Sequence, residues 1–98
     1  MLTGKQRARL RSLASGLSPV FQIGKGGIGT NLVRELDLVL EARELIKIHL
    51  LDTSFLSARE AAGQLSEILG AEPVAAIGSM VVLYRQASDP KKRRISYE

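Results

Sequence analysis

Hydrophobic positions along the 98-residue chain follow two periods, one helical and one extended. Apolar residues at helical spacing predict helices over residues 3–16, 30–43 and 57–69. Short apolar runs bounded by Gly, Pro or polar residues predict strands over residues 20–23, 45–51, 74–77 and 80–85. The expected order of elements is therefore α-β-α-β-α-β-β.

Local signals set most of the element boundaries. Two capping boxes mark the starts of the first and third helices: Thr3 with Gln6, and Ser57 with Glu60. Gly70 is expected to end the third helix, and Gly78-Ser79 to form the turn of an antiparallel hairpin. The apolar stripe of the third helix includes Ile68, whereas Leu38 points away from the stripe of the second helix.

The order of elements predicts an α+β fold. Strand-helix-strand connections favour right-handed parallel units, and the closing hairpin adds an antiparallel strand. We expect a two-layer sandwich in which helices pack on a mixed four-stranded sheet. The length allows one domain, which we place at residues 1–86, followed by a basic, flexible tail at residues 87–98.

Composition argues against most kinds of catalytic site. The chain has no cysteine and one histidine, His49, which excludes disulfides, thiolate metal sites and histidine clusters. Four carboxylates on and just after the second helix are expected to form a solvated face rather than an acid/base pair: Glu35, Asp37, Glu41 and Glu44. We therefore expect no enzymatic activity, no cofactor, no metal and no small-molecule substrate.

The chain lacks the sequence features of secretion and membrane insertion. The N-terminus has no apolar signal-peptide core, and the longest apolar stretch, residues 71–84, is interrupted by polar residues, Gly and Pro. These features predict a cytoplasmic protein that does not bind membranes, and nothing in the sequence demands more than a monomer.

Positive charge is concentrated at the two ends of the chain. The net charge of +4 divides into +5 over residues 1–28, −4 over residues 29–84 and +3 over residues 85–98. This asymmetry favours a polyanionic partner. The candidate contacts in these two basic ends, outside the glycine-rich loop, are Lys5, Arg7, Arg9, Arg11, Arg85, Lys91, Lys92, Arg93 and Arg94. Lys47, on a predicted strand, is a further candidate.

A glycine-rich loop at residues 24–29 lies between a predicted strand and a predicted helix. Such a loop lets backbone N–H groups approach an anion, although the glycines of a tight turn would look similar. A nucleotide phosphate loop needs Lys before Ser or Thr, but Gly29 precedes Thr30, and the dinucleotide-binding spacing is also absent. The stretch Gly24-Lys25-Gly26-Gly27 instead matches the G-x-x-G loop with which KH-type domains clamp nucleic-acid backbones.

The basic first helix and three motifs, P-V-F-Q-I-G-K-G-G, E-L-I-K-I and V-L-Y-R, occur in this order along the chain. With these features the sequence resembles the CRM domain family, and within it the bacterial YhbY-type proteins. The resemblance covers residues 1–96. It implies a fold similar to the C-terminal domain of translation initiation factor three, with an antiparallel last strand. It also implies RNA binding through the loop Gly24, Lys25, Gly26 and Gly27, and association with precursors of the large ribosomal subunit.

We therefore predict a protein that binds structured RNA, with ribosomal RNA of the large-subunit precursor as the implied target. The few aromatic residues form no stacking platform, so recognition should rest on charge and RNA shape. Alternatives remain: a protein-interaction adaptor that docks through Leu38 or the acidic middle, a splicing or chaperone factor for other structured RNA, a DNA-binding protein, and a nucleotide-dependent enzyme.

Overall fold

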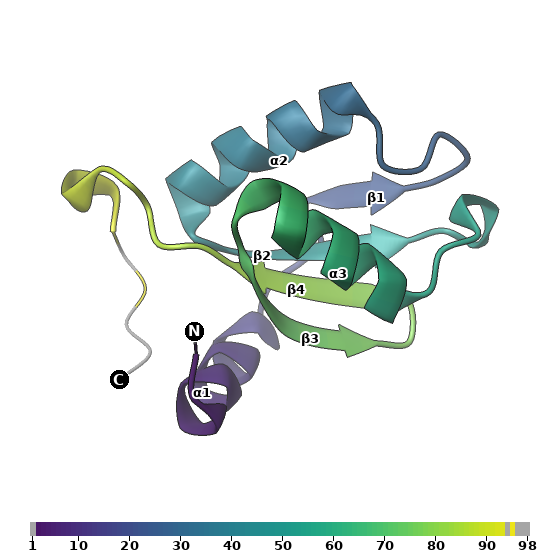
Figure 1. Ribbon diagram of the computed structural model, residues 1–98. Coiled ribbons are helices and arrows are strands. Elements are labelled where there is room, and N and C mark those ends of the chain that lie inside the picture. Colours follow the sequence, from purple (N-terminus) through teal and green to yellow (C-terminus); the bar gives the residue numbers. More distant parts are fainter. Residues whose placement is uncertain (1, 94, 96–98) are drawn as a thin grey trace.

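The computed structural model describes residues 2–93 and 95, and it confirms the predicted order of helices and strands (Figure 1). The helices are α1 (Gly4–Ala14), α2 (Thr30–Arg43) and α3 (Ala58–Leu69). The strands are β1 (Phe21–Ile23), β2 (Leu45–Leu50), β3 (Glu72–Ile77) and β4 (Met80–Tyr84). Two short 3-10 turns follow β2 and β4: η1 (Asp52–Ser54) and η2 (Pro90–Lys92).

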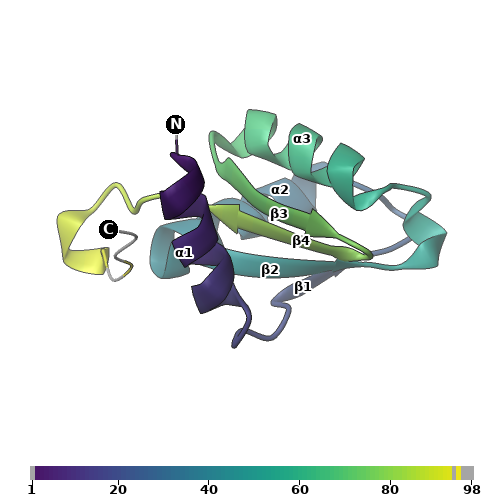
Figure 2. The same ribbon diagram turned by 90° about the horizontal axis from the view of Figure 1, so that it is seen from below.

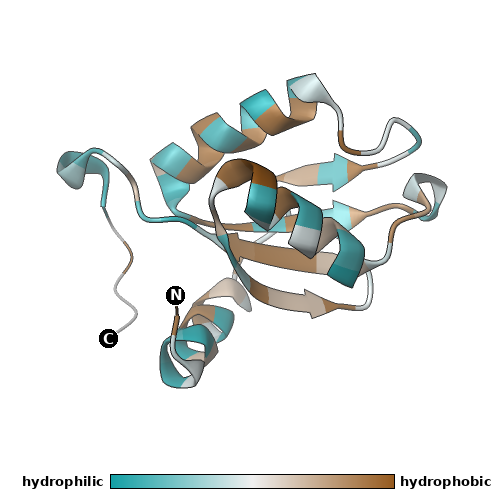
Figure 3. Ribbon diagram, viewed as in Figure 1, coloured by the Kyte–Doolittle hydropathy of each residue, from teal (hydrophilic) through white to brown (hydrophobic). Residues whose placement is uncertain are grey.

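The sheet is mixed, as predicted, with the strand order β1-β2-β4-β3. β1 and β2 are parallel, whereas β4 runs antiparallel to both of its neighbours. The central position of β4 agrees with its hydrophobic residues in Figure 3. β3 is an edge strand, which explains why it tolerates Pro73, a residue without an N–H to donate.

The sheet carries helices on both faces, so α1 adds a third layer to the expected two-layer sandwich. Alternating residues of β2 point to opposite sides: Ile46 and Ile48 pack in the core under α2 and α3, and Leu45 packs with Leu10 and Ala14 of α1. Figure 2 shows α1 crossing the face of the sheet that α2 and α3 leave open. The third layer arises because the strands are apolar on both faces, a property that parallel and central strands share.

Both predicted capping boxes are present and begin α1 and α3. Gly70 adopts a left-handed conformation with φ +64° where α3 ends, as its position predicted. Two apolar side chains of the helices lie outside the core. Leu38 is exposed, and Ile68, which the helical stripe placed in the core, is 55% exposed and lies outside it.

The acidic residues near the end of α2 do not form the expected solvated face. Glu44 is completely buried; its carboxylate accepts hydrogen bonds from the backbone N–H groups of Ala87 (2.8 Å) and Ile95 (2.9 Å). Glu41 accepts from the N–H and hydroxyl of Ser88, both at 2.9 Å, and from the N–H of Asp89 at 3.1 Å. The two carboxylates thus hold the beginning of the predicted flexible tail against α2.

These hydrogen bonds predict that acid weakens the contact between the tail and α2. Donation from the N–H groups of Ser88 and Asp89 and from the Ser88 hydroxyl lowers the pKa of Glu41 from 4.5 to about 2. Because the folded pKa is depressed, the contact should be intact above pH 4.5 and weaken as the pH falls toward 2. The amide resonances of Ser88 and Asp89, followed by NMR between neutral pH and pH 2, measure this change.

Glu41→Gln is the control, because its amide does not ionise over this range. The two amide resonances should then lose their titration. A midpoint near 4.5 in the unaltered protein would contradict the assigned role of the Glu41 carboxylate.

Candidate nucleic-acid interface

Two of the glycines in the loop after β1 have structural reasons to be glycine. The N–H of Gly27 donates to the carbonyl of Gly24 at 2.9 Å and closes a turn in which Gly27 has φ +62°. A methyl group on Gly24 would lie 3.3 Å from Leu51 Cδ1 and 3.4 Å from Thr53 Oγ1. Gly24 therefore permits close packing of this loop against the segment that follows β2.

The other two glycines, Gly26 and Gly29, have no such reason. A methyl group on either would meet no neighbouring heavy atom within 4 Å, and neither has a positive φ. Gly26 and Lys25 are exposed at the tip of the loop. The tight-turn explanation therefore accounts for part of the glycine cluster only, and the remaining glycines leave backbone open to an approaching molecule.

The amino end of α2 adds partial positive charge to the same place. Gly29 is its N-cap and provides no side-chain acceptor, and the first turn contains no acidic residue. The first intrahelical bond joins the N–H of Val33 to the carbonyl of Gly29 at 3.1 Å. Exposed N–H groups at a helix start attract anions, so the loop and this helix end together favour a phosphate.

A strip of polar side chains extends from the loop across the sheet. Gln22 of β1 and His49 of β2 are partners in the parallel ladder, and Lys47 shares their face, on the side that α1 covers in part. Lys47 and Arg11 of α1 line one groove over β3 and β4, together with Ala75, Ile77, Met80 and Val82. The tertiary structure thus brings a cation of the first helix and a cation of the sheet to the same groove.

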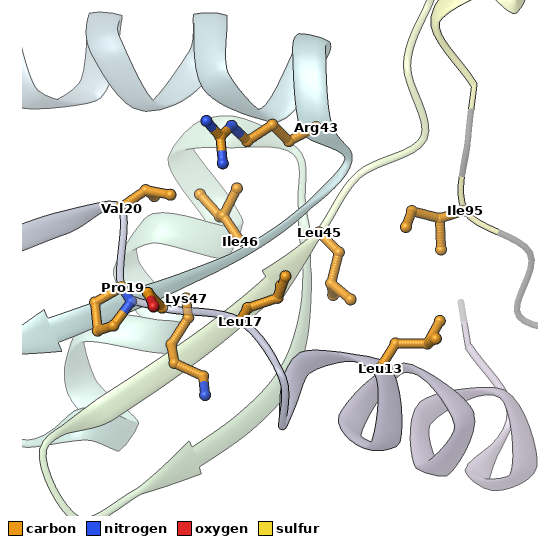
Figure 4. Close-up of a pocket in the computed structure, with 10 residues that line it drawn as sticks. Leu13, Leu17, Pro19, Val20, Arg43, Leu45, Ile46, Lys47 and Ile95 are labelled. Carbon is orange, nitrogen blue, oxygen red and sulfur yellow. The ribbon is translucent and has the colours of Figure 1, made fainter.

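Lys47 also borders a cavity of about 450 Å³ on the other side of α1 (Figure 4). The cavity has apolar walls, and Arg43 at the end of α2 lies across it from Lys47. Its apolar lining residues are Leu13, Leu17, Pro19, Val20, Leu45, Ile46 and Ile95. Arg43 was not predicted as a site residue, since helical spacing alone did not place it near Lys47.

The other predicted cations of α1 lie on two flanks of the helix: Lys5 and Arg9 on one, and Arg7 on the flank that carries Arg11. Lys5 and Arg9 are exposed, and Arg7 is half-buried. They extend the positive charge that begins at Arg11, on the layer of the molecule that lies opposite α2 and α3.

Arg85 lies on the other face of the sheet, away from these cations. One terminal nitrogen of its guanidinium contacts Asp37 Oδ1 at 2.6 Å and the Leu69 carbonyl at 3.1 Å, and the other donates to the Asp37 carbonyl at 2.9 Å. The side chain is 19% exposed. This geometry assigns Arg85 the role of linking α2 to α3, and its predicted RNA contact has no support from its position.

The basic tail residues are separated from the glycine loop. Lys91 and Lys92 belong to η2, which lies at the end of the molecule opposite the loop of residues 24–29 (Figures 1 and 2). Arg93 donates through Nε to the carbonyl of Ala87 at 2.9 Å. Arg94 lies outside the described residues.

Comparison with known proteins decides the family. Residues 2–85 match the CRS1/YhbY (CRM) domain. The protein belongs to the CRM family. This confirms the resemblance inferred from the loop and strand motifs, and the expectation of no enzymatic activity agrees with a family of non-enzymatic proteins.

Individual relatives are similar over nearly the whole of this CRM protein. It is 40% identical to "Probable RNA-binding protein YqeI" of Bacillus subtilis, across 94% of this chain and 96% of that protein. It is 34% identical to a probable RNA-binding protein of Methanocaldococcus jannaschii, across 93% of this chain and 69% of the other. A solution structure of the Staphylococcus aureus protein SAV1595, whose suggested role is RNA binding, superposes with a TM-score of 0.75 at 46% identity and covers 98% of this chain and 100% of that one.

Neither a metal centre nor a membrane span is found in the part of the chain that the structure describes. Among residues 2–93 and 95, no group of three or more His, Asp or Glu side chains is placed to hold a metal ion. No helix formed by these residues is both long and apolar enough to cross a bilayer.

Proposed function

We propose that this CRM protein binds structured RNA through the G-x-x-G loop. The observation that carries the proposal is the open space over Gly26 and Gly29, beside exposed Lys25 and the uncapped start of α2. In this mechanism the loop N–H groups donate to phosphate oxygens, and the Lys25 ammonium adds a full charge. The relatives named as RNA-binding proteins support the choice of ligand.

A phosphate at the loop defines the direction in which the RNA continues. Lys47 on β2 and Arg11 on α1 line one groove, and they would meet phosphates farther along the RNA. Arg7 lies on the same flank of α1 as Arg11 and would extend this contact, and Lys5 and Arg9 would add positive charge from the other flank. Lys91, Lys92 and Arg93 lie too far from the loop to share one phosphate site, so a tail contact would involve a separate part of the RNA.

The target that we propose is ribosomal RNA in a precursor of the large ribosomal subunit. The support is the family to which the chain belongs, and the protein would act in the cytoplasm as a monomer without a cofactor. Ultraviolet cross-linking in growing cells, with sequencing of the attached RNA, tests this target. Reads should concentrate on one large-subunit segment and be lost in Lys25→Glu; scattered reads that the substitution does not change would contradict it.

Lys91→Glu is the matched control for this experiment. It reverses the same charge at the opposite end of the molecule. If both variants lose the reads equally, positive charge in general attracts the RNA and the loop has no special role.

Binding through phosphates also predicts a steep dependence on salt. If about five cations engage the RNA, log K should fall with log salt at a slope of about −3.5 to −4.5. Fluorescence anisotropy with a structured RNA, repeated over a series of salt concentrations, measures the slope, and Lys25→Glu should make it shallower by about one. Competition with duplex DNA tests the DNA-binding alternative, and a flat salt profile is incompatible with the mechanism.

The adaptor alternative has one observation in its favour, which is the exposed apolar surface of Leu38 and Ile68 on α2 and α3. Both residues lie on the helices that cover the face of the sheet opposite α1. A protein partner at this surface would leave the RNA interface free.

A further inference from the structure

A single aromatic ring lies exposed beside the glycine loop. Phe55 is 92% exposed, compared with 69% for Ile77 and 66% for Leu38. The polar sequence around it, Asp52-Thr53-Ser54, predicts a surface loop, but sequence analysis assigned Phe55 no role. Covering a large apolar side chain that is this exposed to water lowers the free energy, so a partner that buries the ring would be bound more tightly.

Phe55 is held in a hydrogen-bonded turn. Phe55 has a left-handed conformation with φ +57°, which is uncommon for a residue other than glycine. Its N–H donates to the Asp52 carbonyl at 3.2 Å, and the N–H of Leu56 donates to Ser54 Oγ at 3.2 Å. The ring therefore projects from a hydrogen-bonded turn and is not at the tip of an irregular loop.

This turn is in direct contact with the G-x-x-G loop. The N–H of Leu51 donates to the carbonyl of Ile23 at 2.8 Å, and Ile23 directly precedes Gly24. Thr53 lies close enough to Gly24 that a methyl group there would be 3.4 Å from its Oγ1. Phe55 is two residues from Thr53, so their Cα atoms are within about 7.6 Å. Figure 1 shows the loop and η1 side by side where β1 and β2 end.

We infer that Phe55 stacks on an unpaired base of the RNA whose phosphate binds at the G-x-x-G loop. This inference rests on the proposed function and adds to it a contact with a base. An aromatic ring offers a flat apolar face that suits any base, and the carboxylate of Asp52 in the same turn disfavours a phosphate there. The protein would thus hold a nucleotide by its phosphate at the loop and by its base at Phe55, and it would prefer RNA with unpaired bases to a continuous duplex.

The experiment uses a tryptophan reporter. The chain contains no tryptophan, so Phe55→Trp introduces a single indole, whose fluorescence a stacked base quenches. The probes are a short single-stranded RNA of mixed sequence and inorganic polyphosphate, which has the charge of a backbone but no bases. RNA should quench the indole of Phe55→Trp, whereas polyphosphate should bind without quenching. Leu38→Trp, at an exposed site on α2, should not respond to either probe.

Affinity measurements complete the test. Phe55→Ala should weaken binding of the single-stranded RNA by about 5- to 100-fold and leave polyphosphate binding unchanged. Phe55→Gly should act in the same way, and because glycine accepts the positive φ, its melting temperature should not fall. A change of less than about twofold in both variants, or an equal loss of polyphosphate binding, would overturn the inference.

Lys25→Glu separates this inference from the proposed function. If Lys25→Glu weakens RNA binding and Phe55→Ala does not, the phosphate site stands and the stacking contact is wrong. If neither substitution weakens binding, both proposals fail. If RNA binding does not quench the reporter but a protein partner covers Phe55, the ring belongs to a protein interface instead.

Discussion

Gly26→Asp is expected to weaken RNA binding by about 30-fold, or about 2 kcal/mol, without destabilising the fold. The new side chain occupies the open space through which the RNA backbone would approach, and its carboxylate repels the phosphate. Because a methyl group at this position meets no atom within 4 Å and φ is not positive, the free energy of unfolding should change by no more than about 0.5 kcal/mol. RNA titration together with urea unfolding measures both quantities.

A neighbouring glycine and an exposed glutamine on α3 provide controls for this result. Gly27→Ala should destabilise the fold by about 1 kcal/mol, because alanine is strained at φ +62°. Gln64→Glu adds a negative charge at an exposed position of α3 and should leave the RNA affinity within about twofold of that of the unaltered protein. If Gly26→Asp binds RNA normally, the open backbone of the loop is not the phosphate site.

Glu44→Ala is expected to lower the free energy of unfolding by about 2–4 kcal/mol. The Glu44 side chain is completely buried and accepts hydrogen bonds from Ala87 and Ile95, so its removal leaves these N–H groups without that acceptor. The strained φ of +67° is present with glutamate and with alanine, so the lost hydrogen bonds and packing account for this difference. Thermal unfolding should show a decrease of roughly 8–30 °C in Tm, since 1 kcal/mol corresponds to about 4–8 °C in a domain of this size.

Glu44→Gly separates the lost hydrogen bonds from the backbone strain at this position. Glycine relieves the backbone strain and removes the same two hydrogen bonds, so its loss of stability should be smaller than that of alanine but still measurable. Glu41→Ala, in a partly exposed contact with the same segment, should cost less than either. A Tm decrease of less than about 2 °C in Glu44→Ala would show that the tail contact is dispensable.

The predictions that held depended on residues close together in the sequence. A capping box needs a side chain and a backbone N–H three residues apart, so Thr3 with Gln6 predicted the start of α1 correctly. The hairpin turn at Gly78-Ser79 is equally local. The position of the glycine loop between a strand and a helix was predictable for the same reason, since these segments are contiguous, whereas its contact with RNA stays a prediction.

The predictions that failed depended on pairs of residues far apart in the sequence. Glu44 and Glu41 resemble solvated residues until the chain returns and brings the N–H groups of Ala87 and Ser88 to them. Ile68 has helical spacing with the core, but the rest of the chain leaves it 55% exposed. A periodic pattern tells which side of a helix is apolar, not how much of that side the rest of the chain covers.

The sequence by itself determined the order of elements, the mixed sheet, the CRM resemblance and the glycine loop, because hydrophobic period and turn chemistry act over a few residues. Tertiary structure alone decided that α1 forms a third layer and that Lys47 and Arg11 line one groove. It also decided that Arg85 links α2 to α3 and that Phe55 lies beside the loop. These features depend on which strands become neighbours and which side chains then meet. That outcome is set by burial and pairing summed over the whole chain, and no short segment contains it.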